Sequence, residues 1–211
     1  FVDNGVPPEV HDAAAAASRN VHEHLTALAL EQPVGAHGLV ALDWHSGNRS
    51  VLVDHDLSGL IVGQTLGTRP EDIYRALVEA TAFGTRVIVE QLETAGVPVV
   101  DFIAAGGLLK NPLVMQVYAD VLRRPIHVID NDQAPAVGSA MHAAVAAGCF
   151  PDIVAAADAM ARLRRDAWLP DATRADVYDR LYAIYRSLHD HFATNRGLMH
   201  GLRAIRREAL A

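Results

Sequence analysis

The sequence has little of several features that would point to particular classes of protein. Its one cysteine, Cys149, leaves no pair for an internal disulfide, which is typical of a protein of the reducing cytoplasm. No apolar run approaches the ~20 residues that a membrane-spanning helix needs. The chain is also poor in positively charged residues, with 18 Lys and Arg against 25 Asp and Glu, which gives a net charge of −7. Since binders of phosphate backbones usually carry a basic face, we expect neither nucleic acid nor a membrane as a partner.

What is present is the composition of an ordinary globular protein. The chain has 211 residues, of which 51% are hydrophobic and 20% are charged. This length predicts one domain, or at most two small ones. The chain starts at Phe1 rather than at a methionine, within sequence that already looks structured. We therefore expect it to be a piece of a longer protein.

The first part of the chain predicts helices around two short strands. Residues 10–30 are rich in alanine and helical in pattern. Residues 38–44 and 60–62 are short apolar runs between glycines, which is typical of buried strands. A long helix is expected to begin after Thr68, because Glu71 stands three residues later, at the spacing of a capping box.

Strand and helix alternate in the middle of the chain. Residues 97–105 and 125–129 are expected to be strands, and residues 112–124 and 135–147 are expected to be helices. This alternation predicts an α/β layer with a parallel element. The remainder, from residue 152 to the end, is expected to be helical.

A pair of glycines between a strand and a helix is the strongest candidate for a binding loop. Gly106 and Gly107 would let a ligand approach the backbone closely, because they carry no Cβ. Asn111 is expected to cap the next helix, whose exposed N–H groups suit anions or polar ligand edges. The same residues could equally form a tight turn before a capped helix, so the glycines alone leave both interpretations open.

The longer motif narrows the choice. Residues 106–122 resemble the C-terminal signature of the FGGY family of carbohydrate kinases. Three other segments resemble that family in the same order and spacing: residues 58–63, 76–84 and 134–148. Within the family, residues 38–49 are most similar to the ribulokinases. The resemblance runs from about residue 37 to residue 150.

The resemblance implies a fold and a division of the chain. The family has a ribonuclease-H-like, actin-like ATPase architecture, with two lobes that hold a nucleotide between them. This chain would be the C-terminal lobe, an α/β domain. It would comprise a helical segment over residues 1–36, an α/β core over residues 37–150 and a helical C-terminal part over residues 151–211.

The resemblance also implies which residues meet the nucleotide. Gly107 and Asn111 would line the adenine and ribose pocket. Gly59, Gly63 and Gly106 would shape the backbone around the nucleotide. The small-residue helix from residue 135 would close beside them.

The implied activity is transfer of a phosphoryl group from ATP, with Mg²⁺, to a sugar such as ribulose. In this family the base that takes the proton, the phosphate loops and the sugar-binding residues lie upstream of the matched region. We therefore expect no catalytic residue after Phe1 and no turnover by this chain alone. A kinase for xylulose, glycerol or a related polyol, and a non-catalytic nucleotide-binding or scaffold module, stay open as alternatives. A homodimer is a candidate assembly. Separately, the surface that the other lobe would cover could drive artificial self-association of the fragment.

Two further patterns could indicate a catalytic or metal site, but a structural explanation is favoured for each. Asp54, His55 and Asp56 could do acid–base work, but their polar surroundings favour a solvated turn. The eleven histidines lack the accompanying ligands and spacing of a zinc site, so we expect no metal centre.

Overall fold

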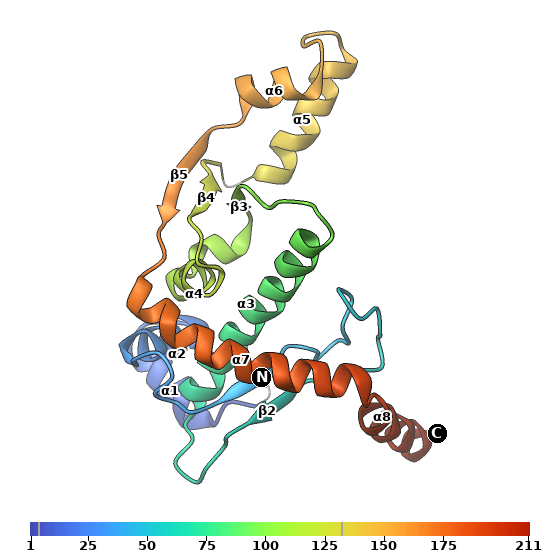
Figure 1. Ribbon diagram of the computed structural model, residues 1–211. Coiled ribbons are helices and arrows are strands. Elements are labelled where there is room, and N and C mark those ends of the chain that lie inside the picture. Colours follow the sequence, from blue (N-terminus) through green and yellow to red (C-terminus); the bar gives the residue numbers. More distant parts are fainter. Residues whose placement is uncertain (4, 132) are drawn as a thin grey trace.

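The chain folds into helices packed around and beside two small sheets (Figure 1), in a computed structural model that describes residues 1–3, 5–131 and 133–211. The elements follow in the order α1 (Pro8–Ala16), α2 (Val21–Glu31), β1 (Val40–Leu42), β2 (Leu60–Val62), α3 (Pro70–Thr94), β3 (Phe102–Ala104), the 3₁₀ helix η1 (Gly107–Lys110), α4 (Pro112–Leu122), β4 (Ile126–Ile129), α5 (Ala134–Ala146), α6 (Ile153–Met160), β5 (Leu163–Trp168), α7 (Ala172–Thr194) and α8 (Gly197–Leu210). Among the described residues, no helix is both long and apolar enough to cross a membrane.

Both sheets contain the strands expected from the apolar runs, although the strands are shorter. β1 and β2 pair antiparallel, with Val40 opposite Val62. β3 and β4 pair in parallel, with Phe102 opposite Ile126, so the expected parallel element is confirmed. The second sheet ends in β5, which pairs antiparallel with β4.

β5 corrects the expectation that the chain is helical from residue 152 onward. α6, α7 and α8 are helical as expected, but β5 interrupts them. Its sequence gave little sign of a strand, because Arg164, Arg165 and Asp166 stand in its middle and are exposed. Charged residues of this kind are common on edge strands, which pair on one side only.

α3 begins one residue later than its sequence suggested. Thr68 does not cap it; its hydroxyl accepts a hydrogen bond from the backbone N–H of Thr65 instead. The N-cap is Arg69, whose backbone N–H donates to Asp72 Oδ2 at 2.8 Å. The expectation of a capping box through Glu71 was therefore wrong by one position, and Pro70 starts the helix.

The main core lies where α3 meets α2, α4, α7 and β1. The aromatic stripe of α7 faces inward: Tyr178, Tyr182 and Tyr185 all surround Phe83 of α3, at ring-centroid distances of 5.4 to 6.2 Å. Phe83 is 1% exposed. Burial of these rings is a large apolar contribution to the stability of the fold.

A network of buried polar side chains ties α2, α3 and α7 together beside that core. Glu79 is 1% exposed and accepts hydrogen bonds from Arg75 Nε at 2.9 Å and Tyr178 Oη at 3.1 Å. Arg75 also donates to the backbone carbonyl of Ala29 at 2.8 Å. Burial, followed by the negative charge of Glu79, raises the pKa of Tyr178. The network therefore buries a charged pair with its hydrogen bonds made, the condition under which such burial is tolerated.

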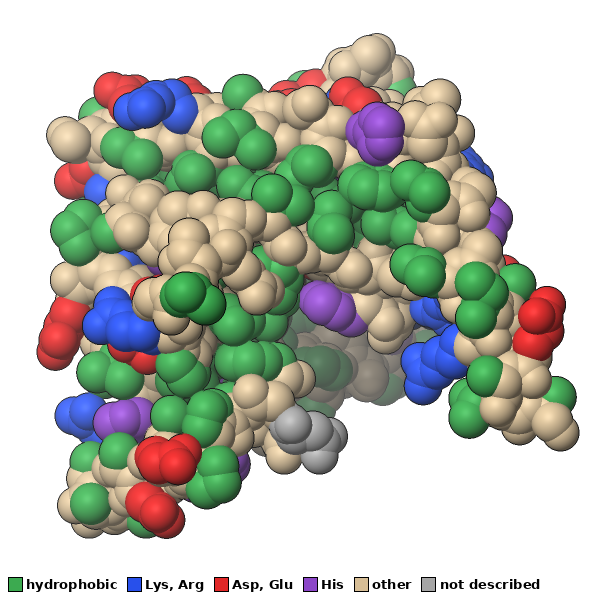
Figure 2. All heavy atoms as spheres, turned by 90° about the horizontal axis from the view of Figure 1, so that it is seen from below, with side chains coloured by type: hydrophobic (Ala, Val, Ile, Leu, Met, Phe, Trp, Pro, Cys, Tyr) green, Lys and Arg blue, Asp and Glu red, His purple; other side chains and the backbone are tan. Residues whose placement is uncertain are grey.

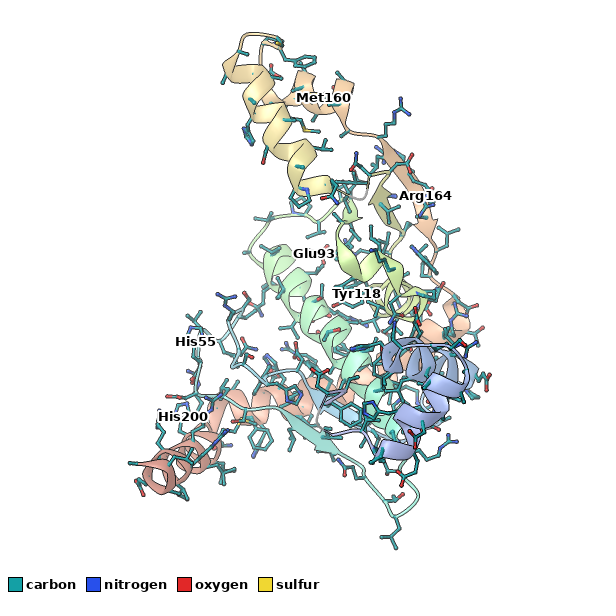
Figure 3. All side chains as sticks on the ribbon, turned by 180° about the vertical axis from the view of Figure 1, so that it is seen from behind. His55, Glu93, Tyr118, Met160, Arg164 and His200 are labelled. Carbon is teal, nitrogen blue, oxygen red and sulfur yellow. The ribbon has the colours of Figure 1, made fainter. Side chains whose placement is uncertain are left out.

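α8 is held by the turn that carries the polar cluster of residues 54–56. Asp54 pairs with Arg196 at 3.2 Å and with His200 at 2.9 Å, and Asp56 pairs with Arg207 at 3.4 Å. Figure 3 shows His200 beside the loop that bears His55. Hydrogen bonds from the backbone N–H of Asp56 and from His200 outweigh partial burial and lower the pKa of Asp54. The cluster is thus a turn that anchors a helix, as its polar surroundings indicated.

The opposite side of α8 is apolar and exposed. Leu198, Leu202 and Ile205 are 62%, 67% and 64% exposed and follow one another at helical intervals. Hydrophobic side chains are also spread in a band across the underside of the molecule (Figure 2). The surface of this chain therefore includes apolar faces that a larger assembly could cover.

Candidate functional site

A cavity of about 920 Å³ opens between α2, α3 and the segment that joins η1 to α4. This volume is within the usual range for small-molecule sites. Its wall includes Gly107 and Asn111 from the glycine motif. It also includes Thr26 of α2, Tyr74 of α3 and Tyr118 of α4. Two of the five predicted nucleotide residues therefore line one cavity.

The glycine loop leaves open space in front of its backbone. Gly106 has a φ of +91°, which L residues other than glycine adopt only under strain. A Cβ placed on Gly106 or on Gly107 would meet no atom within 4 Å. Neither close packing nor a positive φ therefore explains why residue 107 is a glycine. Access of a ligand to the backbone of the loop would explain it.

Asn111 caps α4 as expected and also reaches across the cavity wall. Its Oδ1 accepts from the backbone N–H groups of Leu113 at 3.0 Å and Val114 at 3.3 Å. Its Nδ2 donates to Thr26 Oγ1 at 3.0 Å and to Tyr74 Oη at 3.2 Å. The amide thus already has partners within the protein on both sides, and its direct contact with a nucleotide stays a prediction.

Thr26 and Tyr74 are wall residues that the sequence analysis missed. They are 8% and 7% exposed, and their hydroxyl oxygens lie 3.1 Å apart, although the residues are 48 positions apart in the chain. The only sign of these wall residues in the sequence was a hydroxyl-bearing side chain on the apolar side of α2 and another on the apolar side of α3. Such residues are common, so the pattern alone could not single them out.

Gly59 and Gly63 lie elsewhere and have packing reasons of their own. A Cβ on Gly63, whose φ is +98°, would come within 2.2 Å of the carbonyl oxygen of Gly38. A Cβ on Gly59 would come within 2.4 Å of the His45 ring. Both glycines permit close packing around the β1–β2 pair, and neither lines the large cavity. Their role toward a nucleotide stays a prediction of the family resemblance.

α5 also lies away from the cavity. It packs on α6 in the part of the molecule at the top of Figure 1, and no described residue of α5 belongs to the cavity wall. The expectation that this helix closes beside the nucleotide therefore stays a prediction of the family resemblance.

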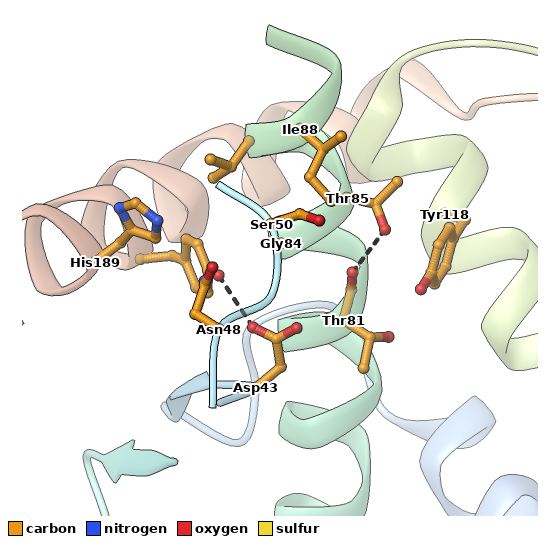
Figure 4. Close-up of a pocket in the computed structure, with 11 residues that line it drawn as sticks. Asp43, Asn48, Ser50, Thr81, Gly84, Thr85, Ile88, Tyr118 and His189 are labelled. Carbon is orange, nitrogen blue, oxygen red and sulfur yellow. Dashed lines mark hydrogen bonds between the residues drawn. The ribbon is translucent and has the colours of Figure 1, made fainter. Parts of the chain in front are cut away.

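A smaller polar pocket of about 200 Å³ adjoins the large cavity (Figure 4), and Thr81 and Tyr118 line both. At its wall, Tyr185 Oη donates to Asp43 Oδ1 at 3.2 Å. Burial raises the pKa of Asp43; burial and the nearby charge of Asp43 raise that of Tyr185. Gly84 of α3 faces the carboxyl group, and a Cβ there would lie 2.9 Å from Asp43 Oδ2. This pocket can therefore hold a polar group, and burial makes ionisation of its one carboxyl, Asp43, less favourable than in water.

Comparison with known proteins gives one consistent result. Residues 8–147 match the model of the FGGY family of carbohydrate kinases, C-terminal domain. The chain is 54% identical to a ribulokinase of Mycolicibacterium smegmatis over 99% of this chain and 37% of that protein. It is 49% identical to a ribulokinase of Geobacillus thermodenitrificans over 91% of this chain and 35% of that protein.

Solved structures agree with the sequence comparisons. A xylulose kinase from Rhodospirillum rubrum superposes with a TM-score of 0.72 at 33% identity, over 90% of this chain and 37% of that one. A ligand-bound xylulose kinase from Lactobacillus acidophilus shares the fold, with a TM-score of 0.73 at 23% identity, over 88% of this chain and 38% of that one. The chain spans a little over a third of the length of these relatives.

Proposed function

The chain belongs to the FGGY family of carbohydrate kinases as a ribulokinase-like C-terminal domain with the actin-like ATPase fold, and we propose that it is the nucleotide-binding lobe of an ATP-dependent ribulokinase. The complete enzyme would transfer the γ-phosphoryl group of ATP to ribulose, giving ribulose 5-phosphate and ADP. Ribulose is favoured over xylulose because identity to the ribulokinases reaches 54%, against 33% to the xylulose kinase from Rhodospirillum rubrum.

The observation that carries this proposal is the cavity beneath the glycine loop. Its volume of about 920 Å³ is sufficient for a nucleotide, and its wall contains Gly107 and Asn111 of the family motif. The aromatic rings of Tyr74 and Tyr118 offer an apolar surface to a planar base. Lys110 and Arg19 are exposed wall residues whose charge suits phosphates.

In this proposal the chain binds and orients the nucleotide, and other parts of the enzyme hold the sugar and its base. Phosphoryl transfer depends on positioning and on neutralisation of phosphate charge. Mg²⁺ would accompany ATP, since it usually binds through substrate phosphates with only one or two carboxylates. Domain closure over the γ-phosphate would exclude water from the reaction.

The test uses Gly107→Val and measures the binding of MgATP and MgADP by calorimetry. A valine at residue 107 should fold normally, because its Cβ would meet no atom within 4 Å, but its side chain would stand in front of the loop. Gly201→Val is the matched control, since a Cβ there also meets nothing within 4 Å and residue 201 lies in α8, outside the cavity. We expect at least about tenfold weaker binding in Gly107→Val and no change in Gly201→Val.

Equal affinity in wild type and Gly107→Val would place the nucleotide elsewhere. Absence of nucleotide binding, both by this chain when folded and by a polypeptide of the length of its relatives, would contradict the proposed function.

A further inference from the structure

The helix α8 carries an apolar face that stays exposed in this chain. The face consists of Leu198, Leu202 and Ile205, which are 62%, 67% and 64% exposed and lie on one side of the helix. Figure 1 shows α8 projecting from the body of the molecule at the C-terminal end of the chain. Helices in proteins are stabilised mainly by tertiary packing of such a face, so the α8 face calls for an occupant.

The opposite side of α8 is fixed, so the helix cannot turn its apolar face inward. Met199 is 4% exposed and belongs to the main core. His200 pairs with Asp54 at 2.9 Å, and Arg203 donates to the backbone carbonyl of Leu57 at 3.3 Å. A rotation that buried the α8 face would break these contacts. The occupant must therefore come from outside this chain.

The α8 face is too small to hold two separate molecules together by itself. Stable interfaces between separate proteins bury about 800 Å² on each partner and involve roughly 20–30 residues a side. The α8 face offers three exposed apolar side chains. Two parts of one polypeptide need a much smaller contact, because their covalent connection raises the effective concentration of one near the other to the order of millimolar. The size of the face therefore favours an occupant in the same polypeptide.

The lengths of the relatives supply such an occupant. This chain covers 37% of the Mycolicibacterium smegmatis ribulokinase and 37% of the Rhodospirillum rubrum xylulose kinase. A polypeptide of that length has more residues outside this chain than within it. The family model that the chain matches is a C-terminal domain, so most of these residues would precede it.

We propose that the α8 face docks onto the N-terminal lobe of the same polypeptide, so that α8 joins the two lobes. This inference rests on the proposed function, in which this chain is one lobe of a two-lobe kinase. Arg206 borders the α8 face and is exposed. The surface that receives α8 is therefore expected to be apolar, with acidic groups at its border.

The experiment measures amide hydrogen exchange in residues 197–211 by mass spectrometry, in this chain alone and in a polypeptide of the length of its relatives. A helix that is docked exchanges more slowly, because it must open before its amides exchange. We expect exchange in wild type to be at least about tenfold slower in the longer polypeptide. In Leu202→Gln/Ile205→Gln the difference should fall to about twofold or less, although Gln keeps α8 helical.

Leu210→Gln is the control, because Leu210 is a leucine of the same helix that is 76% exposed and lies outside the α8 face. It should keep the tenfold difference. Equal exchange in the two wild-type polypeptides, or a difference that persists in Leu202→Gln/Ile205→Gln, would overturn the inference. Protection that rises with protein concentration, together with a doubled mass in analytical ultracentrifugation, would assign the α8 face to a second copy and overturn it as well.

Binding of MgATP is measured on the same samples to keep the two proposals apart. α8 lies outside the large cavity, so Leu202→Gln/Ile205→Gln should bind MgATP as this chain does in wild type. Failure of both wild-type polypeptides to bind MgATP would contradict the proposed function. The exchange results leave that function intact whichever way they fall.

Discussion

The buried network around Glu79 makes a prediction that can be worked out atom by atom. His37 Nδ1 accepts from the backbone N–H of Leu39 at 3.0 Å, so the ring proton is on Nε2, which donates to Glu79 Oε2 at 3.1 Å. The other carboxylate oxygen accepts from Arg75 and Tyr178. Every group facing Glu79 is therefore a donor.

Glu79→Gln keeps the shape of the side chain but supplies only one acceptor oxygen. If that oxygen stays with Arg75 and Tyr178, the new NH₂ group faces the N–H of His37, and two donors oppose each other. The Arg75 charge, which is 4% exposed, also loses its counter-ion. Removal of one partner of a buried pair usually costs 3–5 kcal/mol, and Gln retains some of the hydrogen bonds, so we expect a loss of about 3 kcal/mol.

The measurement is urea unfolding at pH 7 followed by circular dichroism. With a typical m of ~2–3 kcal/mol/M, the midpoint of Glu79→Gln should fall by about 1 M. Glu93→Gln is the matched control, because Glu93 pairs with Arg124 where both side chains are partly exposed, and such pairs contribute about 0–1 kcal/mol. A loss below about 1 kcal/mol in Glu79→Gln, or equal losses in the two variants, would refute the argument that donors alone surround this carboxylate.

Two further predictions concern Asp43 and the glycines. Burial raises the folded-state pKa of Asp43, so its ionised form costs stability, and this cost grows as pH rises from the ordinary value of 3.8 through the folded-state pKa. Asp43→Asn still accepts from Tyr185, so in urea unfolding it should equal wild type near pH 3 and exceed it at pH 7; a wild-type advantage at pH 7 would count against this. Gly63→Ala should lose at least ~2 kcal/mol by the same assay, because of its positive φ and the 2.2 Å approach to Gly38, whereas Gly107→Ala should stay within ~0.5 kcal/mol. Equal losses at the two glycines would contradict the packing explanation.

What the sequence could reveal about the fold was mostly local. The Asn111 cap depends on backbone groups two and three residues away, so the order of residues is enough to predict it. β5 is the opposite case, because Arg164 and Arg165 oppose a strand locally and only pairing with β4 stabilises one there. The cap was therefore predicted correctly and the strand was missed.

For the candidate site, too, the sequence predicted local features and missed those that depend on the arrangement in space. Gly107 and Asn111, which the family motif singled out, line one cavity, and the match to residues 8–147 confirms the family; their contact with a nucleotide stays a prediction. The motif could not separate glycines that face open space from glycines that permit packing, since a sequence records only the absence of a side chain. The surroundings of Gly63 and Gly107 differ in space and not in sequence pattern.

Asn111 has a part in both the fold and the candidate site, because its one amide group caps α4 and also bonds to two other residues of the cavity wall. Asn111→Ala would remove the cap, at a cost of about 0.5–2 kcal/mol, and would also release Thr26 and Tyr74 from their shared partner. Weaker nucleotide binding in that variant would follow equally from a frayed α4, a disordered wall or a lost ligand contact. Asn111→Asp keeps an oxygen that can cap α4, but it replaces the NH₂ donor with an acceptor and adds a negative charge. The comparison of these two variants therefore separates the contribution of the cap from that of the NH₂ group: binding that is lost in Asn111→Asp while stability is kept cannot be attributed to a frayed α4.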